Sequence, residues 1–206
     1  MLKTLKKIWD NPCTLWFILA IPSLMMLRGA LNGGDLERLL HPSGEFSARL
    51  MIIAMMLTPL VMLFPKATAL KWLIRRRRYL GVAAFGYALL HTIFYLVDLD
   101  SLPAILADVL KLSIWTGWLA FLIFIPMAIT SFDGAMQSMG RNWKRLQRLV
   151  YIAAVATLLH WIFVHNNLGP ALVHFLPLAL LEIYRIWKTK NNQRKFQTTK
   201  RTARRA

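Results

Sequence analysis

The sequence predicts an all-α fold, an integral membrane six-helix bundle with both termini cytoplasmic. Hydrophobic residues make up 57% of the 206-residue chain, and the mean hydropathy is +0.46. These residues gather in six runs of 17–19 residues, close to the ~20 that cross a bilayer as a helix. The Lys and Arg residues behind the net charge of +17 fall almost wholly between the runs, whereas a nucleic-acid-binding domain would place them on folded elements.

The expected helices cover residues 13–31, 48–64, 79–97, 112–130, 149–165 and 171–187. The first run has no small-residue cleavage site and is interpreted as a retained anchor. The third and fifth runs each follow a basic cluster. Membrane helices tolerate internal proline when neighbouring helices satisfy the freed carbonyls, and four of the six contain one, at Pro22, Pro59, Pro126 and Pro177.

The basic residues predict the orientation of the bundle. One side has 22 of the 26 Lys and Arg, in four groups: Lys3, Lys6 and Lys7; Lys66, Lys71 and Arg75 to Arg78; Arg141, Lys144, Arg145 and Arg148; and nine between Arg185 and Arg205. The positive-inside rule places this side in the cytoplasm. We expect one membrane domain over residues 1–187. Residues 188–206 are expected to form a basic cytoplasmic tail, disordered and held near anionic headgroups.

The chain lacks the common motifs of catalysis and nucleotide binding. It has no G-x-G-x-x-G, P-loop, H-E-x-x-H or nucleophile elbow, and it leaves no room for a nucleotide-binding domain. Cys13 is the only cysteine, so an intramolecular disulfide or thiolate metal cluster is excluded. We therefore expect no catalytic residues, and any electrons that the chain moves must come from another molecule.

Two histidines inside expected helices form the candidate site. His91 is the thirteenth residue of 79–97 and His160 the twelfth of 149–165, and both helices begin at the basic side. At ~1.5 Å per residue, both imidazoles lie roughly 17–18 Å from that face, slightly past the middle of a core about 30 Å thick. An ionisable side chain at this depth is costly and marks a functional candidate. Two at one level indicate a shared ligand.

Small residues precede both histidines on the same helix face, at positions that include Ala84, Ala88, Ala153 and Ala156. Such residues allow close helix packing, or they leave a slot for a flat macrocycle. We favour haem, with His91 and His160 as the axial ligands of its iron. Zinc lacks further ligands at this depth, and a proton relay lacks carboxylates apart from Glu182. A simple hydrogen bond to a neighbouring helix is the remaining alternative.

The other three histidines are expected near the outer face. His41 falls in the first outer loop, where we expect a surface or loop-capping role. His165 and His174 lie at the outer boundary of their helices, where an interfacial role or a hydrogen bond to a haem propionate is expected.

Several short runs carry a resemblance to a known family. They are His41-Pro42-Ser43-Gly44, Thr58-Pro59-Leu60, Arg77-Arg78-Tyr79-Leu80-Gly81 with Leu90-His91, and Trp143-Lys144-Arg145-Leu146 with Val150-Tyr151 and Leu159-His160. Over about residues 31–161 the chain resembles the MsrQ (YedZ) family. These are haem-binding membrane subunits of the bacterial periplasmic methionine sulfoxide reductase system, within the ferric-reductase-like transmembrane superfamily.

The resemblance implies a multi-pass protein of the bacterial inner membrane that binds b-type haem. It would pass electrons to a periplasmic molybdopterin-containing, MsrP-like methionine sulfoxide reductase, as an electron-transfer subunit rather than a stand-alone enzyme. A cytosolic flavin reductase or the quinone pool would be the donor, and FMN is a reported trait of the family. Because basic loops suit a phosphate, Arg77 and Arg78 are our candidates for the flavin or quinone side.

One position departs from the family pattern. The family usually has a second histidine thirteen residues before the ligand of its fifth helix, and here that position is Gln147. We therefore expect one haem rather than two. Two further functions stay open: a membrane ferric or cupric reductase component that reduces metal at the outer surface, and a non-redox membrane transporter or assembly factor.

Overall fold

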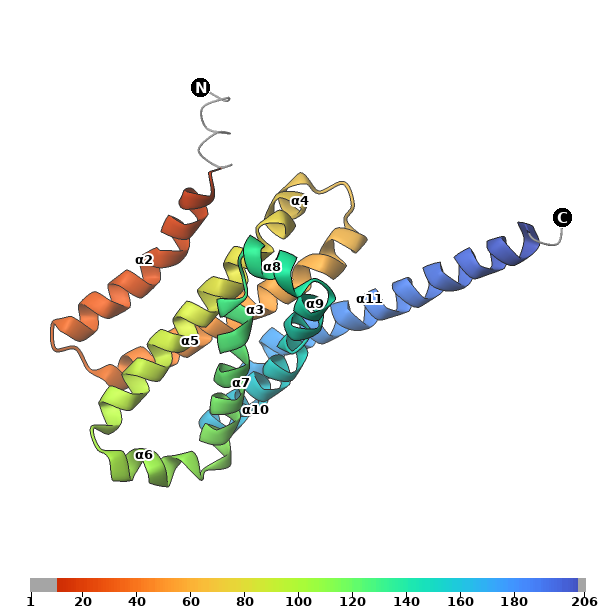
Figure 1. Cartoon of the computed structure of the whole chain (residues 1–206). Helices are drawn as coiled ribbons and strands as arrows, with labels where there is room; N and C mark the ends of the chain where they lie inside the picture. The colour runs from red at the N-terminus through yellow and green to blue at the C-terminus, as the bar shows by residue number, and fades with distance from the viewer. Residues whose placement is uncertain (1–10, 204–206) are drawn as a thin grey trace.

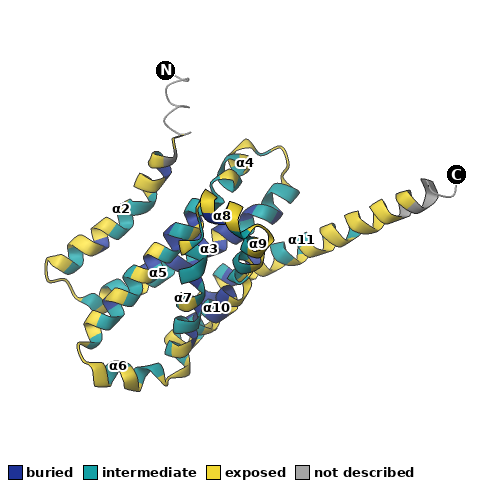
Figure 2. Ribbon diagram, in the orientation of Figure 1, coloured by how far each residue is buried: buried dark blue, intermediate teal, exposed yellow. Residues whose placement is uncertain are grey.

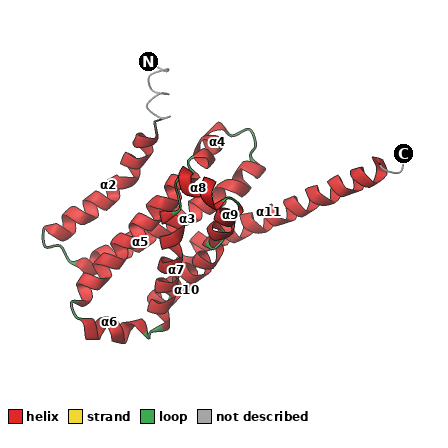
Figure 3. Cartoon of the chain, in the orientation of Figure 1, coloured by secondary structure: helices red, strands yellow, loops and turns green. Residues whose placement is uncertain are grey.

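The structure is a computed structural model that describes residues 11–203, and every regular element in this range is a helix (Figure 3). The basic residues at positions 3, 6, 7, 204 and 205 lie outside the described range. Six segments are long and apolar enough to cross a membrane. They are α2 (Pro12–Leu31), α3 (Leu36–Leu63), α5 (Arg77–Leu99), α7 (Leu112–Ile129), the pair α9 (Arg141–Gln147) and α10 (Val150–His165), and α11 (Leu168–Ala203). The prediction of an all-α, six-span protein is confirmed.

Short helices mark the two ends of the bundle (Figure 1). At one end lie α4 (Thr68–Arg75), α8 (Asp133–Met139) and α9, and at the other lies α6 (Leu102–Val109), which joins α5 to α7. We call the first the arginine end, since Arg75 to Arg78 lie there. The second is the histidine end, where α3 begins near His41 and α10 ends at His165.

The core forms where α3 packs along α5, where α7 packs along α10, and where α11 packs against α3. Buried residues therefore concentrate at the centre of the bundle, while α2 and the far half of α11 are mostly exposed (Figure 2). The exposed side chains of the spans are largely apolar, for example Phe17, Met25, Leu122, Val155 and Val173. Such a surface suits lipid rather than water, in keeping with a multi-pass membrane protein.

α3 begins at Leu36 rather than at residue 48, so the prediction that His41 lies in a loop is wrong. Asp35 caps the helix by accepting a hydrogen bond from the Glu37 backbone N–H. Pro42 and Gly44 disfavour helix locally, yet the helix continues through both. Packing against α5 outweighs this local preference.

α11 continues as one helix to Ala203, so the expected disorder of the basic tail is wrong for residues 188–203. At the arginine end, Lys188 donates hydrogen bonds from Nζ to the Met62 carbonyl and the Tyr184 hydroxyl. Beyond Lys188 the helix leaves the bundle (Figure 1). Lys, Arg and Gln are good helix formers, and extension of an existing helix avoids the cost of nucleation.

Pro22 inside α2 shows how a neighbouring helix satisfies an interrupted backbone. The Tyr87 hydroxyl of α5 accepts from the Ser23 backbone N–H at 3.1 Å and donates to the Leu19 carbonyl at 2.8 Å. These two groups of α2 would pair directly in a regular helix. Tyr87 therefore contacts both groups of the turn beside Pro22 and ties α2 to the bundle, and such support from a neighbouring helix is how internal proline is tolerated in membrane helices.

Candidate functional site

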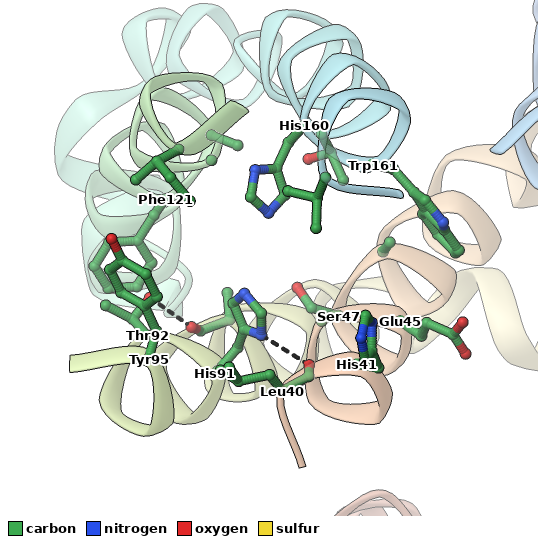
Figure 4. Close-up of a pocket in the computed structure, with 18 of the residues that line it drawn as sticks. Leu40, His41, Glu45, Ser47, His91, Thr92, Tyr95, Phe121, His160 and Trp161 are labelled. Carbon is green, nitrogen blue, oxygen red and sulfur yellow. Dashed lines mark hydrogen bonds between the residues drawn. The ribbon is translucent and has the colours of Figure 1, made fainter. Parts of the chain in front are cut away.

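The structure places His91 of α5 and His160 of α10 opposite each other, as their shared depth predicts. Their ring centroids are 6.3 Å apart and their planes meet at 82°. The two rings project from opposite walls into one cavity (Figure 4).

A backbone carbonyl on the neighbouring helix orients each ring. His91 Nδ1 lies 3.0 Å from the Leu40 carbonyl oxygen of α3 and 3.2 Å from Ser43 Oγ. His160 Nδ1 lies 2.6 Å from the Ser113 carbonyl oxygen of α7. A carbonyl only accepts hydrogen bonds, so each Nδ1 carries the proton and each Nε2 keeps a free lone pair. Histidines that bind metals are held in this way.

A glycine lets each imidazole lie against the helix that holds it. The glycine comes four residues after the accepting carbonyl in both cases, at Gly44 on α3 and Gly117 on α7. A Cβ added at Gly44 would lie 3.2 Å from His91 Nδ1, and one at Gly117 would lie 2.8 Å from His160 Nδ1. The two sides of the site thus repeat one local arrangement of carbonyl, glycine and histidine.

The histidine cavity, as we call this space, has a volume of about 310 Å³ and is bounded by α3, α5, α7 and α10. Its walls are largely apolar, with Ala48, Ala88, Ala120, Phe121 and Phe124 among the lining residues. Polar side chains that belong to the histidine end also line it, namely Glu37, His41, Glu45, Tyr95 and His165. The cavity is therefore apolar in its depth and polar towards the histidine end.

These residues fit haem by two tests. Bonds of about 2 Å from one metal ion to both Nε2 atoms would place the ring centroids about 6 Å apart, and the distance here is 6.3 Å. Within the described residues, no group of three His, Cys, Asp or Glu side chains could hold a metal ion. A metal bound here would bring its remaining ligands with it, as the iron of a porphyrin does.

The alanines predicted to form the slot occupy different places. Ala88 lines the histidine cavity, whereas Ala84 lines a second cavity nearer the arginine end. Ala153 and Ala156 are buried and line neither cavity. Small side chains of α10 thus serve close packing, and the room beside His160 comes from Gly117 on α7.

The second cavity, which we call the arginine cavity, has a volume of about 510 Å³. Arg77 and Arg78 both line it, together with Arg75, Lys144 and Arg148. Its other walls include Met51, Met55, Phe85 and Phe124, and Phe124 also lines the histidine cavity. An anionic ligand with an apolar ring system matches this lining.

Gln147 also lines the arginine cavity, at the position where a second axial histidine was considered. Its side-chain amide donates a hydrogen bond to the Met127 carbonyl at 3.1 Å. No histidine is among the residues that line this cavity.

Sequence reasoning missed Gly44, Gly117 and the two orienting carbonyls. For Gly117 the available signal was a glycine inside an apolar run, because such a residue often marks a close approach. Gly44 lies in a polar stretch beside Pro42 and gave no such signal. The two orienting carbonyls could not be predicted from the sequence, because every residue has a backbone carbonyl. Sequence reasoning also missed that His41 and His165 are neighbours, with His41 Nδ1 3.1 Å from His165 Nε2.

A family model described as a ferric reductase like transmembrane component matches residues 43–158, which include Gly44, His91 and Gly117. The protein-methionine-sulfoxide reductase heme-binding subunit MsrQ of Xanthomonas campestris pv. campestris (strain 8004) is 36% identical over 169 residues, which cover 80% of this chain and 76% of the relative. The subunit of the same name from Rhizobium meliloti (strain 1021) is 35% identical over 164 residues, 78% of this chain and 72% of the relative. No solved structure matches the chain.

Proposed function

The chain belongs to the MsrQ family of protein-methionine-sulfoxide reductase heme-binding subunits, among the ferric-reductase-like transmembrane proteins, and from this premise we propose that it binds one b-type haem between His91 and His160. It is a multi-pass protein of the bacterial inner membrane, and we propose that it carries electrons across that membrane.

One observation carries this proposal: two imidazoles in a largely apolar cavity, 6.3 Å apart between centroids, each with Nδ1 on a carbonyl of the neighbouring helix. Both free Nε2 atoms therefore belong to rings whose orientation is already set. Prior orientation lowers the entropic cost of binding a ligand between them.

When bound, haem supplies an iron centre that changes valence by one electron. The protein's residues do the rest. The carbonyls of Leu40 and Ser113 hold the imidazole tautomers and make the ligand nitrogens more basic. Apolar residues such as Phe121 and Phe124 keep water from the depth of the cavity, and the low polarity there influences the redox potential.

The direction of transfer follows from the charge distribution. The positive-inside rule places the arginine end in the cytoplasm and the histidine end in the periplasm. Electrons would enter from a cytosolic flavin reductase or a quinol, and a flavin such as FMN or a quinone would bind in the arginine cavity beside Arg77 and Arg78. Phe124 forms the wall shared by the two cavities. Electrons would leave to a periplasmic molybdopterin-containing, MsrP-like methionine sulfoxide reductase.

A second function is favoured by the match to a ferric reductase like transmembrane component. In this alternative, a ferric or cupric ion receives the electrons at the histidine end. The haem site would be the same, and only the acceptor would differ.

The test is the absorption spectrum of the purified full-length protein, oxidised and reduced with dithionite. We expect a low-spin spectrum with about one haem per chain by pyridine haemochrome. His91→Ala and His160→Ala should each lose the haem or turn it high-spin, while His174→Ala, on α11 and outside the cavity lining, should keep the spectrum. A wild-type spectrum in both axial variants would refute the ligand assignment.

A further inference from the structure

At the histidine end of the bundle, the histidine cavity is bordered by a group of aromatic rings that are not proposed as axial ligands. Trp161, the residue after His160, lines the cavity and stacks on His174 at 5.0 Å between ring centroids. His165 lies beside Trp161, and His41 lies 5.0 Å from His165 between centroids. These rings come from α3, α10 and α11.

Trp161 has a hydrogen-bond donor without a partner. Its side chain is 5% exposed, yet Nε1 makes no hydrogen bond. A buried indole N–H normally has an acceptor, and leaving it without one costs free energy. Trp161 lines the cavity proposed for haem, so an acceptor carried by the ligand would satisfy it.

The hydroxyl groups of the cavity lining already donate within the protein. Ser47 donates to the Ala84 carbonyl, Thr92 to that of Ala88, and Thr157 to that of Ala153. Tyr95 donates to Asp108. Two indole N–H groups also belong to the lining, those of Trp118 and Trp161, and the one that is buried without a partner is that of Trp161.

The His41–His165 pair lies beside Trp161 at the same end of the cavity. His165 Nδ1 donates to the Trp161 carbonyl at 3.0 Å, and its Nε2 lies 3.1 Å from His41 Nδ1. His165 Nε2 therefore accepts from His41 Nδ1–H, and the ring protons of the pair are engaged within the protein. Glu45 is likewise paired with Arg49 at 2.6 Å.

We propose that Trp161 Nε1 donates a hydrogen bond to a propionate carboxylate of the haem, so that the propionates face the histidine end. This inference rests on the proposed haem site and adds its orientation. The apolar depth of the cavity, with Ala48, Ala120 and Phe124, offers a carboxylate no donor. A carboxylate is an ionised acceptor, and a hydrogen bond to an ionised group is stronger than one between neutral groups.

The experiment pairs a change in the protein with a change in the ligand. Full-length protein made without haem is loaded with protohaem or with its dimethyl ester, which has the same ring and iron but no carboxylate. Release to apomyoglobin is then timed for wild type and Trp161→Phe. The Phe variant keeps an aromatic ring at this position and removes the N–H donor.

We expect Trp161→Phe to release protohaem roughly tenfold faster, as the loss of a hydrogen bond to a charged group implies, and to release the dimethyl ester at the wild-type rate. His174→Phe is the matched control, because His174 lies at the same end and stacks on Trp161 but does not line the cavity. It should leave both rates unchanged.

Equal acceleration for both ligands, or none for either, would overturn the inference. The inference would also be overturned if Arg77→Gln released protohaem faster than wild type but released the dimethyl ester at the wild-type rate. The propionates would then face the arginine end. Failure of the wild-type protein to form a low-spin complex with protohaem would instead overturn the proposed function. The two failures are thus distinguishable.

Discussion

The histidine cavity and the arginine cavity share the walls α3, α5, α7 and α10 and differ in chemistry. His91 of α5 and His160 of α10 line the histidine cavity. Arg77 and Arg78 of α5 and Tyr151 of α10 line the arginine cavity. The first has two opposed imidazoles with oriented rings, while the second has no imidazole and five cationic side chains. The depth of a side chain along its helix therefore decides which cavity it lines and what that cavity can bind. The oriented imidazole nitrogens of the histidine cavity suit a metal, and the guanidinium groups of the arginine cavity, near the membrane surface, suit an anion.

The largest expected effect concerns the glycines of the histidine cavity. Gly117→Ala should reduce haem occupancy at least tenfold, because the new Cβ would lie 2.8 Å from a ring held at 2.6 Å by the Ser113 carbonyl. Gly44→Ala should reduce haem occupancy less, about two- to threefold, because its new Cβ would lie 3.2 Å from His91 Nδ1. Overpacking of this kind typically costs 1–3 kcal/mol. Haem per chain and the low-spin fraction measure both effects.

Gly86→Ala is the control for this series, because nothing lies within 4 Å of its added Cβ. It should keep full occupancy. Equal losses in the Gly44 and Gly117 variants would show that the glycines serve general helix packing rather than the two imidazoles.

An intermediate effect is expected when the arginine cavity receives an imidazole. Gln147→His restores a ligand on one wall, but no histidine lines the wall opposite. We expect haem per chain to rise above one, with the additional haem high-spin because its second axial position lacks a nitrogen ligand. Pyridine haemochrome and electron paramagnetic resonance measure the two quantities. A second low-spin haem would mean that another side chain ligates there.

The third effect concerns charge removal in the arginine cavity. The double variant Arg77→Gln and Arg78→Gln should slow haem reduction by the cytosolic donor roughly tenfold, because the cavity loses charge that attracts an anionic ligand. Reduction by dithionite and the haem spectrum should stay unchanged. Stopped-flow absorbance with each reductant makes the comparison.

A control of equal charge lies at the same end of the bundle. Arg141 and Arg145 belong to α9 but do not line the arginine cavity. Their replacement by Gln should leave donor kinetics near the wild-type rate. Equal slowing in both double variants would indicate surface attraction of the donor rather than a ligand in the cavity.

Much of the fold was predictable, because each span is recorded locally in an apolar run of fixed minimum length. The errors arose where local preference and tertiary contact disagree. Pro42 and Gly44 made the start of α3 look like a loop, and the polar composition of residues 188–203 made a helix look like a disordered tail. Packing on α5 in the first case, and extension of an existing helix in the second, override composition.

The candidate site was predictable in depth but not in detail. His91 and His160 stood out because an ionisable group in hydrocarbon is costly wherever it occurs, and counting residues from a basic cluster gives its depth. The rotation of each helix about its axis was unknown. For that reason the sequence placed Ala84 in the haem slot, whereas it lines the arginine cavity, and the proximity of His41 to His165 went unseen.

Composition and periodicity alone settle the number and order of the spans and the common level of the two histidines, because these are properties of single helices in a bilayer. Only the tertiary structure decides that the two rings face each other, that the Leu40 and Ser113 carbonyls orient them, and that Trp161 keeps a donor without a partner. Each of these depends on how closely and at what rotation two helices meet. That is set by side-chain packing between segments far apart in the chain.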